Sequence, residues 1–167
     1  MSFTNGSTAR VLPMSSDTSA RVPSAAGRLR QAHRAMRAEM LKRIHAAGFP
    51  DVGYAHIPIF RHQGPDGRQP TEIAATAQLS KQAVNNLLGQ LQRAGYLKRK
   101  AHPDDGRARI VQLTARGRRL ETAIWEAGRA VERGWREQIG DADWRVFRRV
   151  LDQIAEANPI DADGDED

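Results

Sequence analysis

Apolar residues recur along most of this chain at spacings of three and four, which places them on one face of an α-helix. This pattern predicts helices over residues 25–47, 51–61, 71–77, 81–93, 115–139 and 141–157. Two short segments, 97–101 and 110–114, instead have the alternation and the flanking turn residues that are typical of strands. The pattern therefore predicts an all-α fold with one small β-hairpin.

The first helix, over residues 25–47, has a narrow apolar stripe that includes Met36, Met40 and Ile44, with arginines around it. Gly48 is expected to end this helix. A stripe this narrow covers little surface, so the helix needs a partner helix to pack against.

A second helix is expected to begin with Asp51 as its cap and to run to about Arg61 or His62. Pro58 would bend or shorten it, because proline lacks an amide hydrogen and clashes with the preceding turn. The following Gln63–Gly67 segment is predicted to be a loop.

Two short helices joined by a tight turn occupy the middle of the chain. The first begins after Pro70, with Thr71 as an N-cap or first-turn residue, and Gln78 and Leu79 make the turn. Ser80 is expected to cap the second helix. Four apolar residues lie on one face of that second helix, namely Val84, Leu87, Leu88 and Leu91.

The opposite face of this second helix carries polar side chains and one glycine, namely Lys81, Gln82, Asn85, Asn86, Gly89 and Arg93. Amide side chains form bidentate hydrogen bonds to adenine in the major groove of DNA, and a glycine permits a close approach of a backbone. Taken alone, this face is also compatible with an ordinary solvated helix surface. The hairpin that follows favours the DNA-binding interpretation.

The predicted hairpin runs from Leu97 to Ala101 and from Ile110 to Thr114, around a Pro-Asp-Asp-Gly turn sequence. Val111 and Leu113 are expected to point inward. From residue 93 to residue 119 the chain carries nine Lys and Arg against two Asp, a net charge of +7. A basic hairpin of this kind suits the phosphates or the narrow minor groove of DNA.

The hairpin sequence resembles the wing of the MarR family of bacterial regulators, whose pattern is D-x-R-x-x-x-V-x-L-T. Here Asp105, Arg107, Val111, Leu113 and Thr114 match every specified position. The resemblance implies a dimeric winged helix-turn-helix transcription factor. It also implies that Arg107 enters the minor groove and that Asp105 orients it.

The two long C-terminal helices are amphipathic, and three tryptophans at positions 125, 135 and 144 indicate a large buried area. An intramolecular core would account for them. A dimer interface formed by the two ends of the chain accounts for them better, and the resemblance implies the same. Gly140 is expected to end the first of these helices and Asp141 to cap the second.

The formal net charge is +6, and five acids lie between residues 161 and 167, so residues 1–160 carry +11. This basic body indicates an anionic partner. The chain has no cysteine, which excludes disulfides and thiolate zinc sites. No apolar run approaches the ~20 residues of a membrane span, and no signal-peptide core is present, so a cytoplasmic protein is expected.

Five histidines offer no metal-ligand spacing. No nucleophile–base pair, phosphate-binding loop or paired carboxylates are evident, so neither enzymatic activity nor a cofactor is predicted. His45, Tyr54 and His56 fall near the junction of the dimer helices and the DNA-binding part. The family resemblance suggests that they could line a pocket for a small anionic aromatic effector. Ordinary core-edge and surface positions also account for them.

These observations predict a winged helix-turn-helix with a helical dimerisation region. Residues 1–24 are expected to be a disordered arm, 25–50 and 115–158 the dimerisation region, 51–114 the DNA-binding region, and 159–167 an acidic tail.

The predicted function is a ligand-responsive repressor that binds a pseudo-palindromic operator as a homodimer. The expected base contacts are Gln82, Asn85 and Asn86. The expected backbone contacts are Ser80, Lys81, Arg93, Lys98 and Lys100, with Arg109 beside Arg107 in the wing. Two alternatives remain, a nucleoid-type protein that coats DNA with little sequence preference and a winged-helix protein-interaction domain.

Overall fold

The computed structural model describes residues 24–61, 67–101 and 109–158. The predicted N-terminal arm up to residue 23, His62, the tip of the wing with Asp105 and Arg107, and the acidic tail lie outside the described residues. The elements are α1 (Ala25–Ala46), a 3-10 helix η1 (Tyr54–His56), α2 (Ile57–Arg61), α3 (Pro70–Ala77), α4 (Lys81–Arg93), β1 (Leu97–Ala101), β2 (Arg109–Leu113), α5 (Ala115–Ile139) and α6 (Asp141–Ala157).

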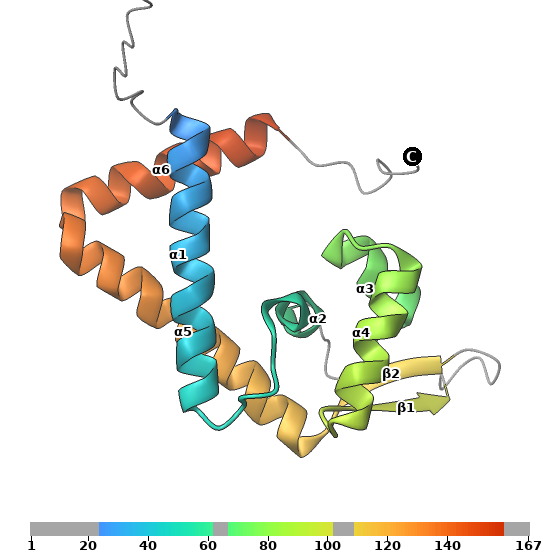
Figure 1. Cartoon of the computed structure of the whole chain (residues 1–167). Coiled ribbons are helices and arrows are strands. Elements are labelled where there is room, and N and C mark those ends of the chain that lie inside the picture. The colour runs from blue at the N-terminus through green and yellow to red at the C-terminus, as the bar shows by residue number, and fades with distance from the viewer. Residues whose placement is uncertain (1–23, 62–66, 102–108, 159–167) are drawn as a thin grey trace, which may run out of the picture.

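The elements form two lobes that share the long helix α5 (Figure 1). At one end of α5, the helices α3 and α4 and the hairpin β1–β2 form a compact lobe, and α2 lies between this lobe and α1. Helix α5 packs against α1 where the two helices cross, and α6 then turns back toward the start of α1. The fold is the predicted one, mostly helical with a two-stranded antiparallel sheet.

The predicted bounds of α1 are confirmed to within one residue, and the helix is capped by Ser24. The prediction of a helix starting at residue 51 is wrong. Instead α2 begins at Ile57, after a single 3-10 turn, and Pro58 lies in its first turn. Proline is tolerated only in the first turn of a helix, so a continuous helix across residue 58 is excluded.

The helix-turn-helix follows the predicted order with one change at its start. Of the two predicted roles, Thr71 has that of a first-turn residue, and the N-cap of α3 is Gln69, because Pro70 occupies the first helical position. The backbone N–H of Gln69 donates to the carboxylate of Glu72 at 2.9 Å. Ser80 caps α4 as predicted, since its hydroxyl accepts from the N–H of Ala83 at 3.2 Å.

The hairpin pairs Leu97 with Leu113 and Ala101 with Arg109. Strand β2 begins and ends one residue earlier than predicted, because Thr114 is already the N-cap of α5. Buried side chains in β2 do not strictly alternate, since both Ile110 and Val111 are buried. The backbone of Arg68 pairs with Val111 on the edge of β2 away from β1.

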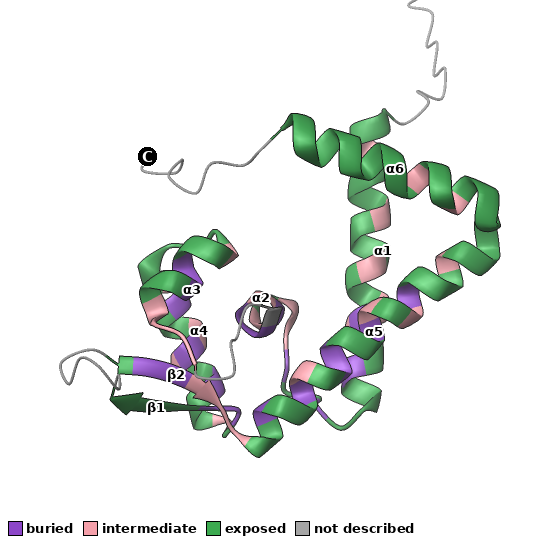
Figure 2. Cartoon of the chain, turned by 180° about the vertical axis from the view of Figure 1, so that it is seen from behind, coloured by how far each residue is buried: buried purple, intermediate pink, exposed green. Residues whose placement is uncertain are grey.

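The buried core lies where the two lobes meet, and Figure 2 shows it in purple. It includes Ile44 from α1, Phe60 from α2, Leu88 from α4 and Leu120 from α5. Because these side chains form one cluster, the helix-turn-helix is fixed to α1 and α5 by apolar packing.

Burial stops beyond Val131, and no residue of α6 is buried. Within the single chain the three tryptophans are not fully buried, so an intramolecular core does not account for them. Trp125 is 48% exposed, and Trp135 and Trp144 are half-buried. Asp141 is the first residue of α6 rather than its cap, and its carboxylate pairs with Arg136 at 2.7 Å. The large exposed apolar side chains of α6 are Val146, Val150, Leu151 and Ile154.

Candidate DNA-binding surface

Helix α4 presents two distinct faces. Val84, Leu88 and Leu91 are buried in the core, and Leu87 packs partly against it. The predicted contact residues on the other face are all exposed, namely Lys81, Gln82, Asn85, Asn86 and Arg93. One helix surface therefore offers two cations and three amide side chains to solvent.

Gly89 lies half-buried in the middle of α4. A Cβ built at this position would have the guanidinium of Arg93 as its nearest neighbour, at 3.5 Å, which is ordinary contact. The protein itself leaves room for a side chain here, although glycine weakens a helix interior by ~1 kcal/mol relative to alanine. The fold alone therefore does not account for a glycine at position 89.

The basic hairpin follows α4 after a short connection through Gly95. Lys98 and Lys100 lie on the same face of β1, because successive side chains of a strand alternate. Both lysines and Arg109 at the start of β2 are exposed. The predicted positive charge is thus presented on the two strands of the hairpin.

Thr114, the last residue of the wing pattern, joins three elements. Its hydroxyl accepts from the N–H of Gly117 at 3.1 Å and donates to the carbonyl of Gly95 at 2.7 Å. Its own N–H donates to the carbonyl of Tyr96 at 2.9 Å. The end of α4, the base of the hairpin and the start of α5 are therefore held together at one residue.

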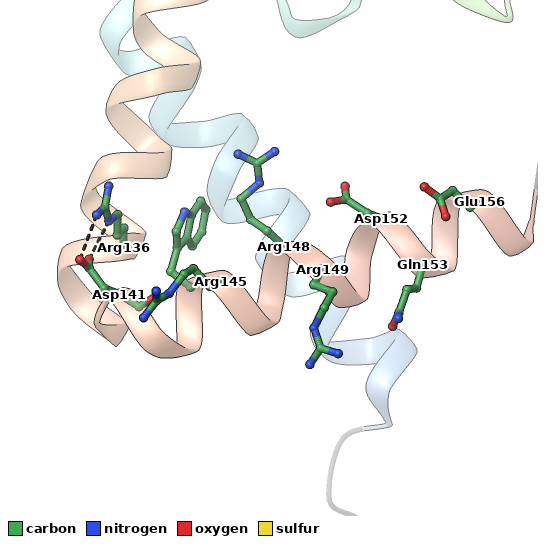
Figure 3. A pocket seen from close by; sticks show the side chains of 9 residues that line it. Arg136, Asp141, Arg145, Arg148, Arg149, Asp152, Gln153 and Glu156 are labelled. Carbon is green, nitrogen blue, oxygen red and sulfur yellow. Dashed lines mark hydrogen bonds and ion pairs between the residues drawn. The ribbon is translucent and has the colours of Figure 1, made fainter.

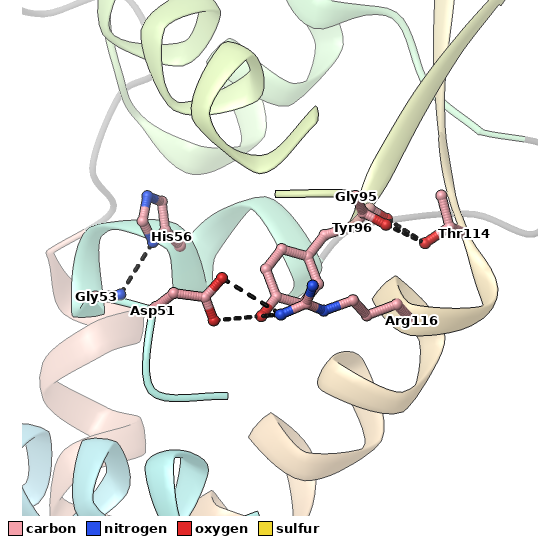
Figure 4. Close-up of polar contacts among 7 residues, drawn as sticks. All are labelled: Asp51, Gly53, His56, Gly95, Tyr96, Thr114 and Arg116. Atoms are coloured by element: carbon pink, nitrogen blue, oxygen red, sulfur yellow. Dashed lines mark hydrogen bonds and ion pairs between the residues drawn. The ribbon is translucent and has the colours of Figure 1, made fainter. Parts of the chain in front are cut away.

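A polar network at the same junction was not predicted. The Tyr96 hydroxyl donates to Asp51 at 2.6 Å, and Arg116 donates to that hydroxyl at 3.0 Å and to Asp51 at 3.4 Å (Figure 4). The hydrogen bond from Tyr96 lowers the pKa of Asp51. Burial, together with the hydrogen bond to Asp51, raises the pKa of Tyr96.

Each of the three residues suggested for an effector makes a contact within the protein. His45 contacts the carbonyl of Val52 at 2.9 Å. His56 accepts from the N–H of Gly53 at 3.0 Å and lies 3.0 Å from the side-chain oxygen of Gln90. Tyr54 has the guanidinium of Arg37 4.3 Å from its ring centre. These contacts are structural links at the junction, and whether a ligand replaces any of them stays a prediction.

Two open cavities are found elsewhere on the described residues. One, of about 640 Å³, lies between the end of α5 and α6 and is lined by Arg136, Arg145, Arg148 and Arg149 together with acids (Figure 3). The other, of about 580 Å³, lies between the end of α1 and α5. Within the described part of the chain, no helix is long and apolar enough to cross a membrane, and no cluster of potential metal ligands occurs.

Comparison with known proteins agrees with this architecture. Residues 59–108 match the model of the MarR family. HTH-type transcriptional repressors of Mycobacterium tuberculosis and Mycobacterium bovis are 29% identical over 126 residues, which is 69% of this chain and 90% of each relative.

Solved structures of similar fold include the repressor CouR bound to a 23-mer DNA duplex, with a TM-score of 0.66 and 22% identity over 79% of this chain and 92% of that one. CouR of Rhodococcus jostii RHA1 bound to p-coumaroyl-CoA has a TM-score of 0.63 and 20% identity over 81% and 94%.

The fold, with its capped α4, basic hairpin and joining threonine, defines a winged helix-turn-helix protein. Residues 59–108 of the chain match the MarR family, and the chain is similar to HTH-type transcriptional repressors.

Proposed function

We propose that the chain is a homodimeric repressor that binds a pseudo-palindromic DNA operator. The observation that carries the proposal is the exposed face of α4 with Gln82, Asn85 and Asn86, which the basic hairpin follows in the chain. In a dimer, two such helices would lie in adjacent major grooves about one helical turn apart. By its match to the wing pattern, Arg107 would enter the minor groove with Asp105 as its orienting partner.

The homodimer is supported by the apolar side of α6. Val150, Leu151 and Ile154 are 41%, 36% and 53% exposed, and they lie on one helix of which no residue is buried in the described chain. An exposed apolar stripe on an amphipathic helix is the usual mark of an interface. A second copy that covers α6 and the outer end of α5 would bury it. Ile139, 43% exposed, would belong to the same interface.

Release by a small anionic aromatic molecule is the remaining part of the proposal. One MarR-type neighbour, CouR, was solved with p-coumaroyl-CoA. In this chain His45 lies in the last turn of α1, and Tyr54 and His56 begin and end the 3-10 turn η1. His56 contacts Gln90 on α4. A ligand that displaced this contact would act directly on the helix that is proposed to read DNA.

The test compares binding to a duplex selected from a random pool with binding to a scrambled duplex of equal length, over a series of salt concentrations. A sequence-specific regulator binds the selected duplex ~10³-fold or more tightly at physiological salt. Equal affinities with a steep salt dependence for both duplexes would indicate a nucleoid-type protein and would refute the proposal. Light scattering of Ile154→Asp, expected to be monomeric, tests the interface separately.

A further inference from the structure

Asp51, Tyr96 and Arg116 come from three segments that are far apart in sequence. Asp51 lies in the connection after α1, Tyr96 directly after α4, and Arg116 in the first turn of α5. Their side chains form one connected set of hydrogen bonds, and the guanidinium of Arg116 also lies over the Tyr96 ring, 4.4 Å from its centre (Figure 4).

Tyr96 is held by its backbone at one end and by its hydroxyl group at the other. Its N–H donates to the carbonyl of Leu91 at 2.9 Å, which closes the end of α4. Its ring is 1% exposed and packs near Phe49 and Phe60. The hydroxyl at the far end of this ring is the atom that reaches Asp51 and Arg116. The orientation of the last turn of α4 is therefore tied to α5 through one rigid side chain.

The same connection touches α4 a second time, one and a half turns earlier. His56 accepts from the N–H of Gly53 with one ring nitrogen, so the other nitrogen carries the proton and donates to Gln90. Residues 51–56 thus contact α4 at Gln90 and also hold Tyr96, whose N–H is bonded to Leu91 in the last turn of α4. Two separated contacts restrict the orientation of α4, whereas a helix held at a single contact could rotate about that contact.

The polar network has little to contribute to stability. The side chains of Arg116 and Asp51 are 44% and 43% exposed, and ion pairs of that exposure are weak. The buried ring of Tyr96 would be held by its apolar neighbours without its hydroxyl. Hydrogen bonds are directional, so what the network adds is a defined orientation.

We propose that Asp51, Tyr96 and Arg116 are positioning residues that set the angle between α4 and α5, and thereby the half-site spacing that the dimer accepts. This inference rests on the proposed function, because spacing has a meaning only for a dimer on a two-part site. Helix α5 has 25 residues, a length of roughly 37 Å. A rotation of about 5° over such a lever moves its end by about 3 Å, close to the rise of one base pair.

The test measures binding to the selected duplex, to duplexes with the half-site spacing changed by one base pair, and to a single half-site. We expect wild-type protein to prefer one spacing by about tenfold or more. Tyr96→Phe and Arg116→Gln should narrow that preference to about threefold or less, or move it to the neighbouring spacing, since couplings of this kind are modest. Affinity for the single half-site should stay within about twofold of wild type.

Arg43→Gln is the matched control. It removes an exposed ion pair of similar kind, 2.8 Å from Glu39 within α1, which does not reach α4. Its spacing profile should equal that of the wild type. If Tyr96→Phe and Arg116→Gln also keep the wild-type profile, the network only supports the fold and the inference is overturned. If Tyr96→Phe loses its fold, Asp51→Asn and Arg116→Gln decide the question with the buried ring intact.

A distance measurement on the protein without DNA tests the inference a second time. Because the chain has no cysteine, Gln92→Cys on the exposed side of α4 gives one labelling site per protomer. The distance distribution between two spin labels should be broader in Tyr96→Phe than in Arg43→Gln, and equal widths would contradict the inference. A wild-type protein without any spacing preference would instead refute the proposed dimeric operator binding, and this inference with it.

Discussion

The hydroxyl of Thr114 donates a 2.7 Å hydrogen bond to the carbonyl of Gly95, which joins the first residue after β2 to the turn that ends α4. The same hydroxyl caps α5. Thr114→Ala should therefore destabilise the fold by ~1–2 kcal/mol, as the loss of an N-cap usually does. Thr114→Ser keeps the hydroxyl and should lose less than half as much. Chemical denaturation compares the two variants, and equal losses would show that only the methyl group matters.

Gly117 lies where a side chain would collide with the backbone of Tyr96. A Cβ at this position would lie well inside contact distance of the Tyr96 carbonyl oxygen. Gly117→Ala should destabilise the protein by ~1–3 kcal/mol despite the better helix propensity of alanine. Gly134→Ala, in the same helix with nothing within 4 Å, should instead stabilise by ~0.5–1 kcal/mol. Opposite signs in thermal denaturation are expected, and a stabilising Gly117→Ala would be incompatible with this packing.

At Gly89 a substitution is expected to change stability and DNA affinity in opposite directions. Alanine fits this position in the free protein and should stabilise α4 by ~0.5–1 kcal/mol. If DNA approaches the helix closely at this point, the same methyl group should weaken operator binding. We expect a higher melting temperature together with a lower affinity. A Gly89→Ala protein that is more stable and binds as tightly as wild type would remove Gly89 from the binding surface.

The lowered pKa of Asp51 has a consequence for stability in acid. A carboxyl whose folded pKa lies below its unfolded value of ~3.9 stabilises the fold above that pH, and the contribution is lost as pH falls through the folded pKa. At the observed exposure the contribution is at most ~1 kcal/mol. Asp51→Asn should therefore be less stable than wild type at pH 6, and the difference in unfolding free energy should be smaller at pH 3, which lies below the unfolded pKa. Urea denaturation at both values measures it, and a gap independent of pH would exclude an ionic origin.

The sequence predicted α4 and α5 well because their signals are local. Ser80 is a cap residue directly before an apolar stripe, and Gly140 follows the last residue of α5. The start of α2 was missed because Asp51 looked like a cap. In the structure its carboxylate is used by Tyr96, 45 residues away. No periodicity connects residues so distant, which is also why the Asp51–Tyr96–Arg116 network was not foreseen.

The exposed face of α4 was predicted residue by residue, since a helix with three buried apolar positions fixes which side chains remain outside. The residues at the junction of α4, the hairpin and α5 were harder to predict from the sequence. Gly117 is one glycine in the first turn of a helix, and only the close approach of the Tyr96 carbonyl explains it. The apolar face of α6 was expected from its periodicity and was assigned to a dimer interface, but periodicity alone does not say which surface covers such a face.

The central claim is that α4 reads bases while the hairpin holds phosphates. Fluorescence anisotropy of Gln82→Ala and Lys98→Ala on the selected and the scrambled duplex tests it most directly. Gln82→Ala should cost ~1–3 kcal/mol on the selected duplex and almost nothing on the scrambled one. Lys98→Ala should weaken both about equally and flatten the salt slope by roughly one unit. If Gln82→Ala weakens both duplexes alike, the outer face of α4 does not read sequence and the account is wrong.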